Sequence, residues 1–351
     1  MMLARHALLL MVAVGCTLLV TGGCATTASG PFVWADPAYQ LTWPPPPDQA
    51  RLRYLRSITG PADFRRDDRS RKLFSWLFGE GEEDLPLLTP FAIATDDAET
   101  VWVADSGSRM LYRIVLSTGD IEYIQEVDRL RLTSPSGLAL DVAQGRVYLA
   151  DAALDHVFVL DTKGRLIGRL SPPGGFKRPA GLAVDRHGQV YVADVLAGTV
   201  AIFDAKGSFL SHRGSLMNPG GKFSRPLNVA IGPDGQLLVV DSMNFRVEVQ
   251  SAQGGLLGTI GRPGDAPGTF ARPKGITVDR NGHVFVADAA FDNIQVFDLT
   301  GRLLMHFGNA GAGPGQFNLP AGLFSDRNGL LFVADGYNHR VQVFEILDSA
   351  K

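Results

Sequence analysis

Six aspartates recur at one fixed place in the sequence, and they are its most regular chemically capable side chains. Each ends a short apolar run of the Val-Ala-Asp type, and successive members are separated by 46, 43, 47, 47 and 47 residues. A carboxylate can accept backbone N–H bonds, pair with arginine or bind a cation. The six residues are Asp105, Asp151, Asp194, Asp241, Asp288 and Asp335.

Polar residues follow these aspartates within five positions. One hypothesis gives the aspartates a structural role: hydrogen bonds and ion pairs that join neighbouring repeats, which contribute modestly when partly exposed. The other hypothesis treats the residues that follow them as one docking surface carried on loops, where binding residues concentrate. The members of that surface are Arg109, Asp155, His156, Asn244, Arg246, Asp292, Asn293, Asn338, His339 and Arg340.

The elements that position these residues belong to a repeat. A period in the 40s indicates units that bury their apolar faces only against neighbours. In the third copy, four short runs rich in β-branched and aromatic residues are separated by polar, Gly-containing turns, which is typical of antiparallel strands. We therefore predict an all-β fold, a six-bladed β-propeller with four antiparallel strands per blade, over 51–348, with the six repeats at 89–348.

The pattern resembles the NHL-repeat family of six-bladed propellers. The resemblance is carried by RPKGITVDRNGHVFVADAAFDNIQVFDLTGRLL at 272–304 and by LPAGLFSDRNGLLFVADGYNHRVQVFEI at 319–346. It covers about three quarters of the chain, and it is specific because all six copies register together. The resemblance implies the fold, whereas function must be argued from a site, since one fold hosts many functions.

Enzymes of this fold class carry metal ligands at known places in the blade, and the same places can be examined in this sequence. Amidating lyases carry His directly after the Pro that opens a blade, as a catalytic zinc requires; here those positions hold Phe91, Ser136, Ala180, Leu227, Lys274 and Ala321. Lactonase-like propellers hold calcium with oxygen ligands, for which Asn228 and Asn218 are the candidates. His156 and His339 occupy equivalent places in blades two and six, with a whole blade between them, so we do not expect them to share a metal ion. We expect no catalytic residue, no metal site and no cofactor.

The sixth repeat stops before its outer strand. Residues 51–59 have the residue pattern of an outer strand. They precede a stretch that contains Gly and Phe, as the outer strands of other repeats precede the Gly-rich crossings that link the repeats. We predict that 51–59 is a closing strand that completes the last blade, because an unpaired sheet edge is an aggregation hazard. Each crossing is expected to bury one Phe.

The front of the chain has the form of a secreted lipoprotein. Residues 1–23 combine early basic residues with an apolar run, as in a signal peptide, and Thr21-Gly22-Gly23-Cys24 resembles a lipobox. We expect lipidation at Cys24, a Pro-rich extended tether over 24–50 and an insert or cap over 61–88. An acyl anchor would hold the protein on a membrane without spanning it.

Composition narrows the functional classes. A formal net charge of −3 shows no basic surplus, so we expect no nucleic acid partner. The two cysteines, Cys16 and Cys24, fall in the signal and at the lipid site, so we expect no disulfide in the mature fold. The hypothesis is a monomeric binding scaffold in the bacterial envelope, facing the periplasm from the outer membrane, with an envelope protein or extracytoplasmic polymer as partner. The alternatives are a metal-dependent lactonase- or lyase-like enzyme acting at the axis and a periplasmic small-ligand sensor.

Overall fold

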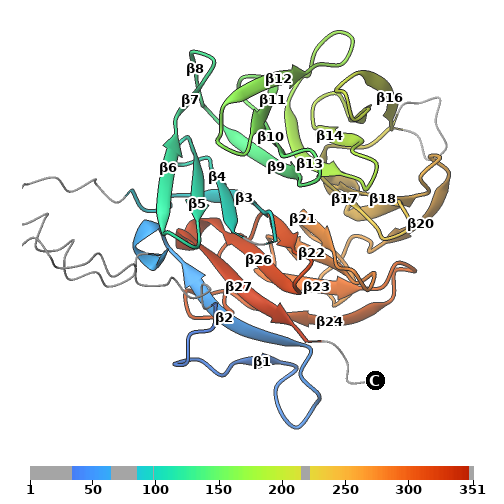
Figure 1. The fold of residues 1–351 in the computed structure, drawn as a ribbon. Coiled ribbons are helices and arrows are strands. Elements are labelled where there is room, and N and C mark those ends of the chain that lie inside the picture. The colour runs from blue at the N-terminus through green and yellow to red at the C-terminus, as the bar shows by residue number, and fades with distance from the viewer. Residues whose placement is uncertain (1–33, 65–84, 98, 215–221, 348–351) are drawn as a thin grey trace, which may run out of the picture. The chain divides into compact units, whose positions relative to one another are not determined.

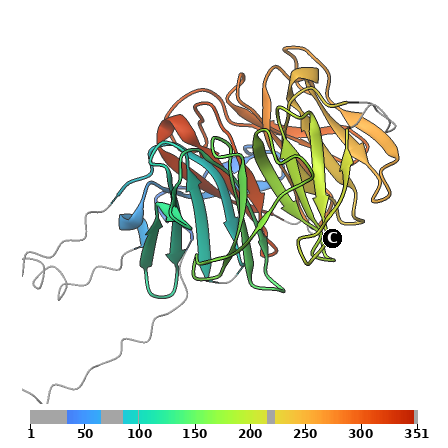
Figure 2. The same ribbon diagram turned by 90° about the horizontal axis from the view of Figure 1, so that it is seen from above.

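Six antiparallel sheets follow one another in chain order around a common axis (Figure 1). The computed structural model describes residues 34–64, 85–97, 99–214 and 222–347, which lie within one compact unit. Innermost strands of successive sheets contact each other in a closed cycle. Seen from above, the blades stand beside one another from teal through yellow to red (Figure 2). The predicted six-bladed β-propeller is confirmed.

Blades one to three each contain four strands, numbered from the axis outward. Blade one is β3 (Pro90–Thr95), β4 (Thr100–Asp105), β5 (Met110–Val115) and β6 (Asp120–Ile124). A small hairpin, β7 (Glu126–Val127) and β8 (Leu130–Arg131), leads to blade two. Blade two is β9 (Pro135–Asp141), β10 (Arg146–Asp151), β11 (His156–Asp161) and β12 (Leu166–Leu170). Blade three is β13 (Pro179–Val184), β14 (Val190–Asp194), β15 (Thr199–Phe203) and β16 (Phe209–Arg213).

Blades four and five repeat this plan, and blade six departs from it. Blade four is β17 (Pro226–Ile231), β18 (Leu237–Asp241), β19 (Arg246–Gln250) and β20 (Leu256–Ile260). Blade five is β21 (Pro273–Val278), β22 (Val284–Asp288), β23 (Asn293–Phe297) and β24 (Leu303–Phe307). Blade six takes β25 (Leu323–Ser325), β26 (Leu330–Asp335) and β27 (Arg340–Ile346) from the C-terminal side. Short 3₁₀ turns occur at η1 (Pro61–Phe64), η2 (Ser242–Asn244) and η3 (Gly336–Asn338).

Position within a blade decides how each strand is buried. The second strands are covered on both faces, and every residue of β22 is buried. The outer strand β24 alternates instead between half-buried and exposed residues before it ends on buried Phe307. Neighbouring blades sandwich the middle strands while one face of an outer strand meets water, which explains the continuous apolar runs and the more polar fourth runs.

The N-terminal closing strand is confirmed. Strand β2 (Leu52–Ile58) pairs antiparallel with β27, from Leu52 opposite Ile346 to Ile58 opposite Val341. It supplies the fourth strand that the last repeat lacks. Ile58 is fully buried with Val341 and Val343 in the core shared by blades six and one. The ring therefore closes through residues almost 300 positions apart.

The predicted tether is wrong over the part that the structure describes. Residues 34–50 form a strap on blade six, in which β1 (Thr42–Trp43) adds a fifth strand beside β2. Trp43 packs on Phe307 and Phe344, with ring centroids 5.7 Å away in each case. Aromatic side chains bury large areas, and they hold this Pro-rich segment against the blade. Cys24, the predicted signal peptide and residues 24–33 lie outside the described residues.

The crossings between blades bury the expected phenylalanines. Phe223, Phe270 and Phe317 are each 3% exposed or less. In the crossing into blade six, a Cβ on Gly308 would lie 2.4 Å from Phe317 Cε2, and Gly308 has φ +86°. Glycine is required there because it tolerates the left-handed conformation and leaves room for the ring.

Only the ends of the predicted insert are described, since residues 65–84 lie outside the described range. At one end, Asp63 accepts hydrogen bonds from the amides of Thr59 and Gly60. At the other, Tyr112 donates to the carbonyl of Pro86 at 3.1 Å. The cap itself stays a prediction. Within the ranges described, no helix has the length and apolar character to cross a bilayer.

Candidate binding face

The six recurring aspartates, which we call the ring aspartates, end the second strands of the six blades. They hold the chain where it enters each blade. They are Asp105, Asp151, Asp194, Asp241, Asp288 and Asp335. Asp105, fully buried, accepts hydrogen bonds from the amides of Leu88 at 2.7 Å and Thr89 at 2.9 Å, just before β3 begins. The other five carboxylates, all 3% exposed or less, accept an N–H from the residue 17 positions earlier. The donors in order are Ser134, Lys177, Ser224, Ala271 and Asn318. The aspartates therefore have a structural role, but the predicted position of their bonds is wrong, because these bonds tie each crossing to its own blade and do not join two neighbouring repeats.

The same carboxylates shape the turn between the second and third strands. Asp105 also accepts the amides of Gly107 and Ser108. The fourth residue after each ring aspartate has a positive φ, between +49° and +67°. These residues are Arg109, Asp155, Gly198, Phe245, Asp292 and His339. Because side chains strain in this conformation, hydrogen bonds from both flanks of the loop are needed to hold it.

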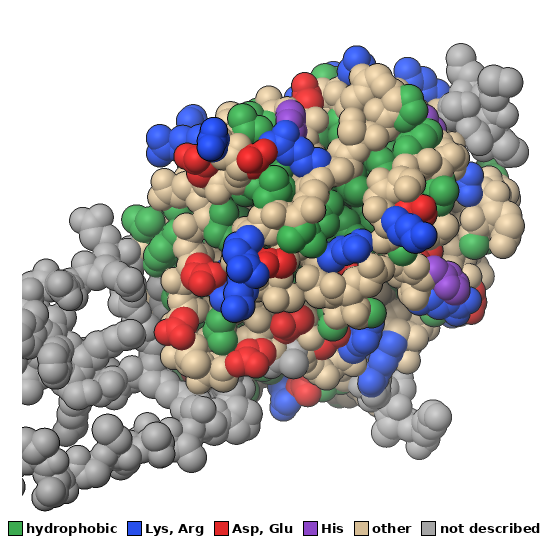
Figure 3. Space-filling model, turned by 45° about the horizontal axis from the view of Figure 1, so that its top comes forward, with side chains coloured by type: hydrophobic (Ala, Val, Ile, Leu, Met, Phe, Trp, Pro, Cys, Tyr) green, Lys and Arg blue, Asp and Glu red, His purple; other side chains and the backbone are tan. Residues whose placement is uncertain are grey.

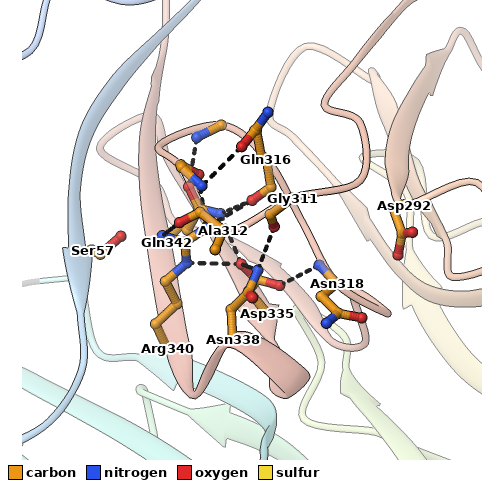
Figure 4. A network of polar contacts seen from close by, with 12 residues as sticks. Ser57, Asp292, Gly311, Ala312, Gln316, Asn318, Asp335, Asn338, Arg340 and Gln342 are labelled. Carbon is orange, nitrogen blue, oxygen red and sulfur yellow. Dashed lines mark hydrogen bonds and ion pairs between the residues drawn. The ribbon is translucent and has the colours of Figure 1, made fainter.

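Asp335 is the centre of the densest network on this face (Figure 4). It accepts hydrogen bonds from Asn318 N, Asn338 Nδ2, Arg340 Nε and Gln342 Nε2 at 2.8–3.0 Å. Arg340 also donates to the carbonyls of Ala312, Gly313 and Gln316, each at 2.8 Å. A planar guanidinium suits this role since it offers five donors in fixed directions.

Arg340 is a correction to the predicted docking surface. It is 8% exposed, and its bonds to the carbonyls of Ala312, Gly313 and Gln316 direct it into the crossing that precedes blade six. Asn338 is half-buried and donates to Gly311 O as well as to Asp335. Both side chains therefore fix the loop that a partner would meet, and they are occupied inside the protein.

The remaining predicted residues divide by exposure. Exposed residues are Arg109, Asp155, Asn244 and His339, whereas His156, Arg246, Asp292 and Asn293 are half-buried. Arg246 lies 3.0 Å from Glu248 and 3.7 Å from Asp241, and Asp292 accepts the amide of Leu319 at 2.6 Å. His156 and His339 contact the backbone carbonyls of Leu154 and Leu88 through Nδ1. All ten residues lie between the second and third strands of their blades or at the start of the third strand.

Two buried glutamines were missed by sequence reasoning. Gln342 accepts the amide of Gly315 at 2.8 Å and donates to Gln316 O at 2.6 Å. Gln295 repeats this one blade earlier, with Gly268 N and Thr269 O both at 2.8 Å. The sequence does contain a pattern that could have revealed them: a Gln lies inside a Val- and Phe-rich strand and recurs 47 residues later. A buried amide there satisfies the crossing backbone.

The axis contains a cavity of about 220 Å³, lined by the innermost strands. Its polar side chains bond within the wall: Ser136 donates to Pro179 O at 3.2 Å, and Thr277 pairs with Ser325 at 3.0 Å. Asn228, the proposed calcium ligand, accepts the amide of Val229 at 2.8 Å. Asn218 lies outside the described residues. No cluster of three or more His, Cys, Asp or Glu side chains suited to a metal occurs in the described ranges.

The exposed surface around the axis mixes apolar and basic side chains. Leu196, Met243 and Tyr337, each two residues after a ring aspartate, are 57%, 54% and 61% exposed. Half-buried Lys274 lies in the position after an opening proline, and its burial lowers its pKa. A space-filling view shows apolar side chains lying among lysines and arginines on the molecular surface (Figure 3).

Comparison with known proteins agrees with this architecture. The family model for the NHL repeat matches residues 270–297 and 317–344, which contain the first, second and third strands of blades five and six, apart from the end of β27. The protein is an NHL-repeat propeller. No curated protein sequence matches it significantly.

Solved structures share the fold of this NHL-repeat propeller at low sequence identity. A virginiamycin B lyase from Staphylococcus aureus is 16% identical with a TM-score of 0.53, covering 74% of this chain and 95% of its own. A gluconolactonase from Xanthomonas campestris is 18% identical with a TM-score of 0.57, covering 84% and 98%. A Bacteroides thetaiotaomicron protein of unknown function is 15% identical with a TM-score of 0.59, covering 74% and 70%. These similarities establish the fold alone.

Proposed function

We propose that this NHL-repeat propeller is a non-catalytic binding scaffold whose partner docks on the aspartate face. We define that face as the turns after the six ring aspartates and the residues just before the six opening prolines. The carrying observation is that large apolar side chains, Leu196, Met243 and Tyr337, project from loops held by buried carboxylates. Exposed apolar residues grouped on one surface commonly mark interaction sites.

Rigidity supports a binding role for this face. Each turn is held by hydrogen bonds to a carboxylate that is nearly or fully buried, so the backbone positions that carry its exposed side chains are fixed. A surface that is already ordered loses little conformational entropy when a partner docks. The ring thus supplies a preformed platform, and the side chains that differ among the six turns can select the partner.

The proposed location is the bacterial envelope, with a lipid on Cys24 as the membrane anchor. Support comes from the lipobox-like Thr21-Gly22-Gly23-Cys24 after an apolar run. Expression with radiolabelled palmitate tests this directly. Label should enter the wild type and be absent from Cys24→Ser, which should also leave the membrane fraction. Equal labelling of both proteins would remove the anchor from the proposal.

Photo-crosslinking tests the docking face. A photoreactive amino acid at Asn244 or His339, both exposed on the aspartate face, should capture a specific envelope partner. The matched control places the same amino acid at exposed Arg186, in a hairpin at the opposite end of blade three. Capture from Arg186 with none from either test position would reverse the assigned face.

The alternative functions place a small ligand in the axial cavity rather than on the aspartate face. The named enzymes among the structural neighbours, a virginiamycin B lyase and a gluconolactonase, motivate the catalytic alternative. Elemental analysis of purified protein separates the hypotheses. Stoichiometric calcium or zinc, lost on chelation together with a lactonase or lyase activity, would replace the scaffold proposal with the enzyme.

A further inference from the structure

Two positions in every blade meet on the aspartate face without being fixed by the fold. One is the residue before the opening proline and the other lies two residues after the ring aspartate. Backbone bonds from the residue just before the second position hold the two segments side by side, such as Val195 N to Arg178 O at 3.0 Å and Ala289 N to Arg272 O at 3.0 Å. Since the main chain makes these contacts, the two side chains are free to differ between blades.

The six pairs of residues at these positions are strongly asymmetric around the ring. Blades one and two carry small, uncharged pairs, whereas blades three to six carry cationic or large apolar side chains. In order from blade one, the pairs are Thr89 with Gly107, Ser134 with Ala153, Arg178 with Leu196, Arg225 with Met243, Arg272 with Ala290, and Leu319 with Tyr337. We call the pairs of blades three to six the basic sector.

The arginines of the basic sector are available to a partner. Arg178, Arg225 and Arg272 are exposed, and none forms an ion pair among the described residues. Exposed lysines, Lys177 and Lys222, lie close to them in sequence. Three guanidinium groups beside Leu196 and Met243 offer bidentate contacts to carboxylates next to apolar contacts.

Negatively charged carboxylates near the basic sector affect how it would attract a partner. The ring aspartates lie beneath it, and Asp194 accepts the amides of both Lys177 and Arg178. Exposed Asp155 and Asp265 and half-buried Asp292 add negative charge on the same face. These carboxylates oppose the long-range attraction of an anion, so recognition must come from contact with the guanidinium groups and the apolar side chains.

We infer that the basic sector binds an acidic protein segment whose Glu or Asp residues alternate with apolar ones. This inference rests on the proposed function and names its partner class. Single-stranded nucleic acid fits less well because it favours several aromatic platforms between the cations. The large exposed residues of the sector are aliphatic, apart from Tyr337.

Fluorescence anisotropy with the full-length protein tests the inference. The probe is a labelled peptide of about 15 residues, rich in alternating Glu and Leu, compared with Gln–Leu and Lys–Leu peptides and a uridine oligonucleotide. We expect Arg178→Glu/Arg225→Glu to weaken binding of the Glu–Leu peptide at least about tenfold. Leu196→Ala/Met243→Ala should weaken it several-fold. The control, Arg186→Glu/Lys206→Glu, makes the same charge change at exposed sites at the opposite end of blade three.

Failure of this inference differs from failure of the proposed function. Equal binding of the Glu–Leu and Gln–Leu peptides, tighter binding of the oligonucleotide, or equal loss in the control variant would overturn the acidic-segment inference. Crosslinking from Asn244 and His339 would still establish the docking face in that case. Circular dichroism and melting of each variant separate lost binding from lost folding.

Discussion

At the scale of single residues, the six ring aspartates show how one buried carboxylate can fix the same loop geometry in every repeat. Each is buried, and each accepts an N–H from the residue 17 positions before it, which fixes a crossing. Burying an ionised group is costly unless hydrogen bonds satisfy it. The recurring Asp is therefore explained by backbone donors that recur with it, and its regularity does not itself indicate catalysis.

Arg340→Lys should test this principle where the network is densest. Lysine keeps the charge but cannot reach Asp335 and the carbonyls of Ala312, Gly313 and Gln316 together. We expect a loss of about 2–4 kcal/mol in free energy of unfolding, because buried acceptors are left unpaired. Arg165→Lys is the control, since its side chain is 73% exposed and its pair with Asp161 lies at the surface, so the substitution should cost under about 1 kcal/mol. Equal losses in urea unfolding would contradict the role given to Arg340.

Asp326 gives a pH-dependent prediction at the opposite end of the blades. Burial, and then the nearby charge of Asp97, raise the pKa of Asp326 to about 6, although its carboxylate accepts the amide of Leu330. The folded protein therefore keeps a proton on Asp326 up to a higher pH than the unfolded chain does. The charged form costs stability above pH 6, and that cost disappears as the pH falls through the folded pKa towards the ordinary value.

Asp326→Asn should stabilise the protein at pH 7.5 by about 1–3 kcal/mol, on the basis of 1.36 kcal/mol per pKa unit. Asparagine keeps the acceptor for Leu330 and removes the charge. The advantage should shrink at pH 4.5, measured by thermal unfolding. Asp298→Asn is the matched turn variant with the opposite sign, because hydrogen bonds from Thr300 and Arg302 help lower the pKa of Asp298 to about 2. A constant effect of Asp326→Asn at both pH values would refute the assignment.

At the scale of elements, the last blade is assembled from both ends of the described chain. Strand β2 completes it, and the strap of residues 34–50 covers its outer edge through β1. Edge strands expose unpaired backbone groups. The strap thus gives blade six a protected edge that the outer strands of blades two to five lack among the described residues.

Two truncations separate the strap from the closing strand. A chain beginning at residue 51 loses Trp43 and its contacts with Phe307 and Phe344, but retains β2. A chain beginning at residue 60 loses β2 as well, including Ile58 from the core between blades six and one. We expect a modest fall in melting temperature for the first and a large fall for the second, because only the second opens the ring. Identical melting curves for the second chain and the full protein would disprove closure by β2.

At the scale of the whole molecule, the innermost strands contact one another in a closed cycle, but the outer rim is uneven. Hydrogen exchange should follow this. Amides at 51–54 should exchange more slowly than those of β12, β16, β20 and β24, since Arg51 N and Tyr54 N donate to Trp43 O and Leu41 O of the strap. Mass spectrometry of peptic fragments measures the difference. Faster exchange at 51–54 than in the other outer strands would show that the strap does not protect the rim.

The sequence by itself determined the number of blades, the four strands of each and the closing strand. This is because strand periodicity and turn residues can be recognised within short stretches of sequence, and the same pattern recurs in every repeat. Tertiary structure decided that residues 34–50 pack on blade six and that Arg340 turns inward to the crossing before it. Those outcomes depend on rings and carbonyls brought together from distant positions, such as Trp43 beside Gly315 and Phe344. A repeat pattern fixes which residues share a face, whereas burial of each side chain depends on the loops that fold over it.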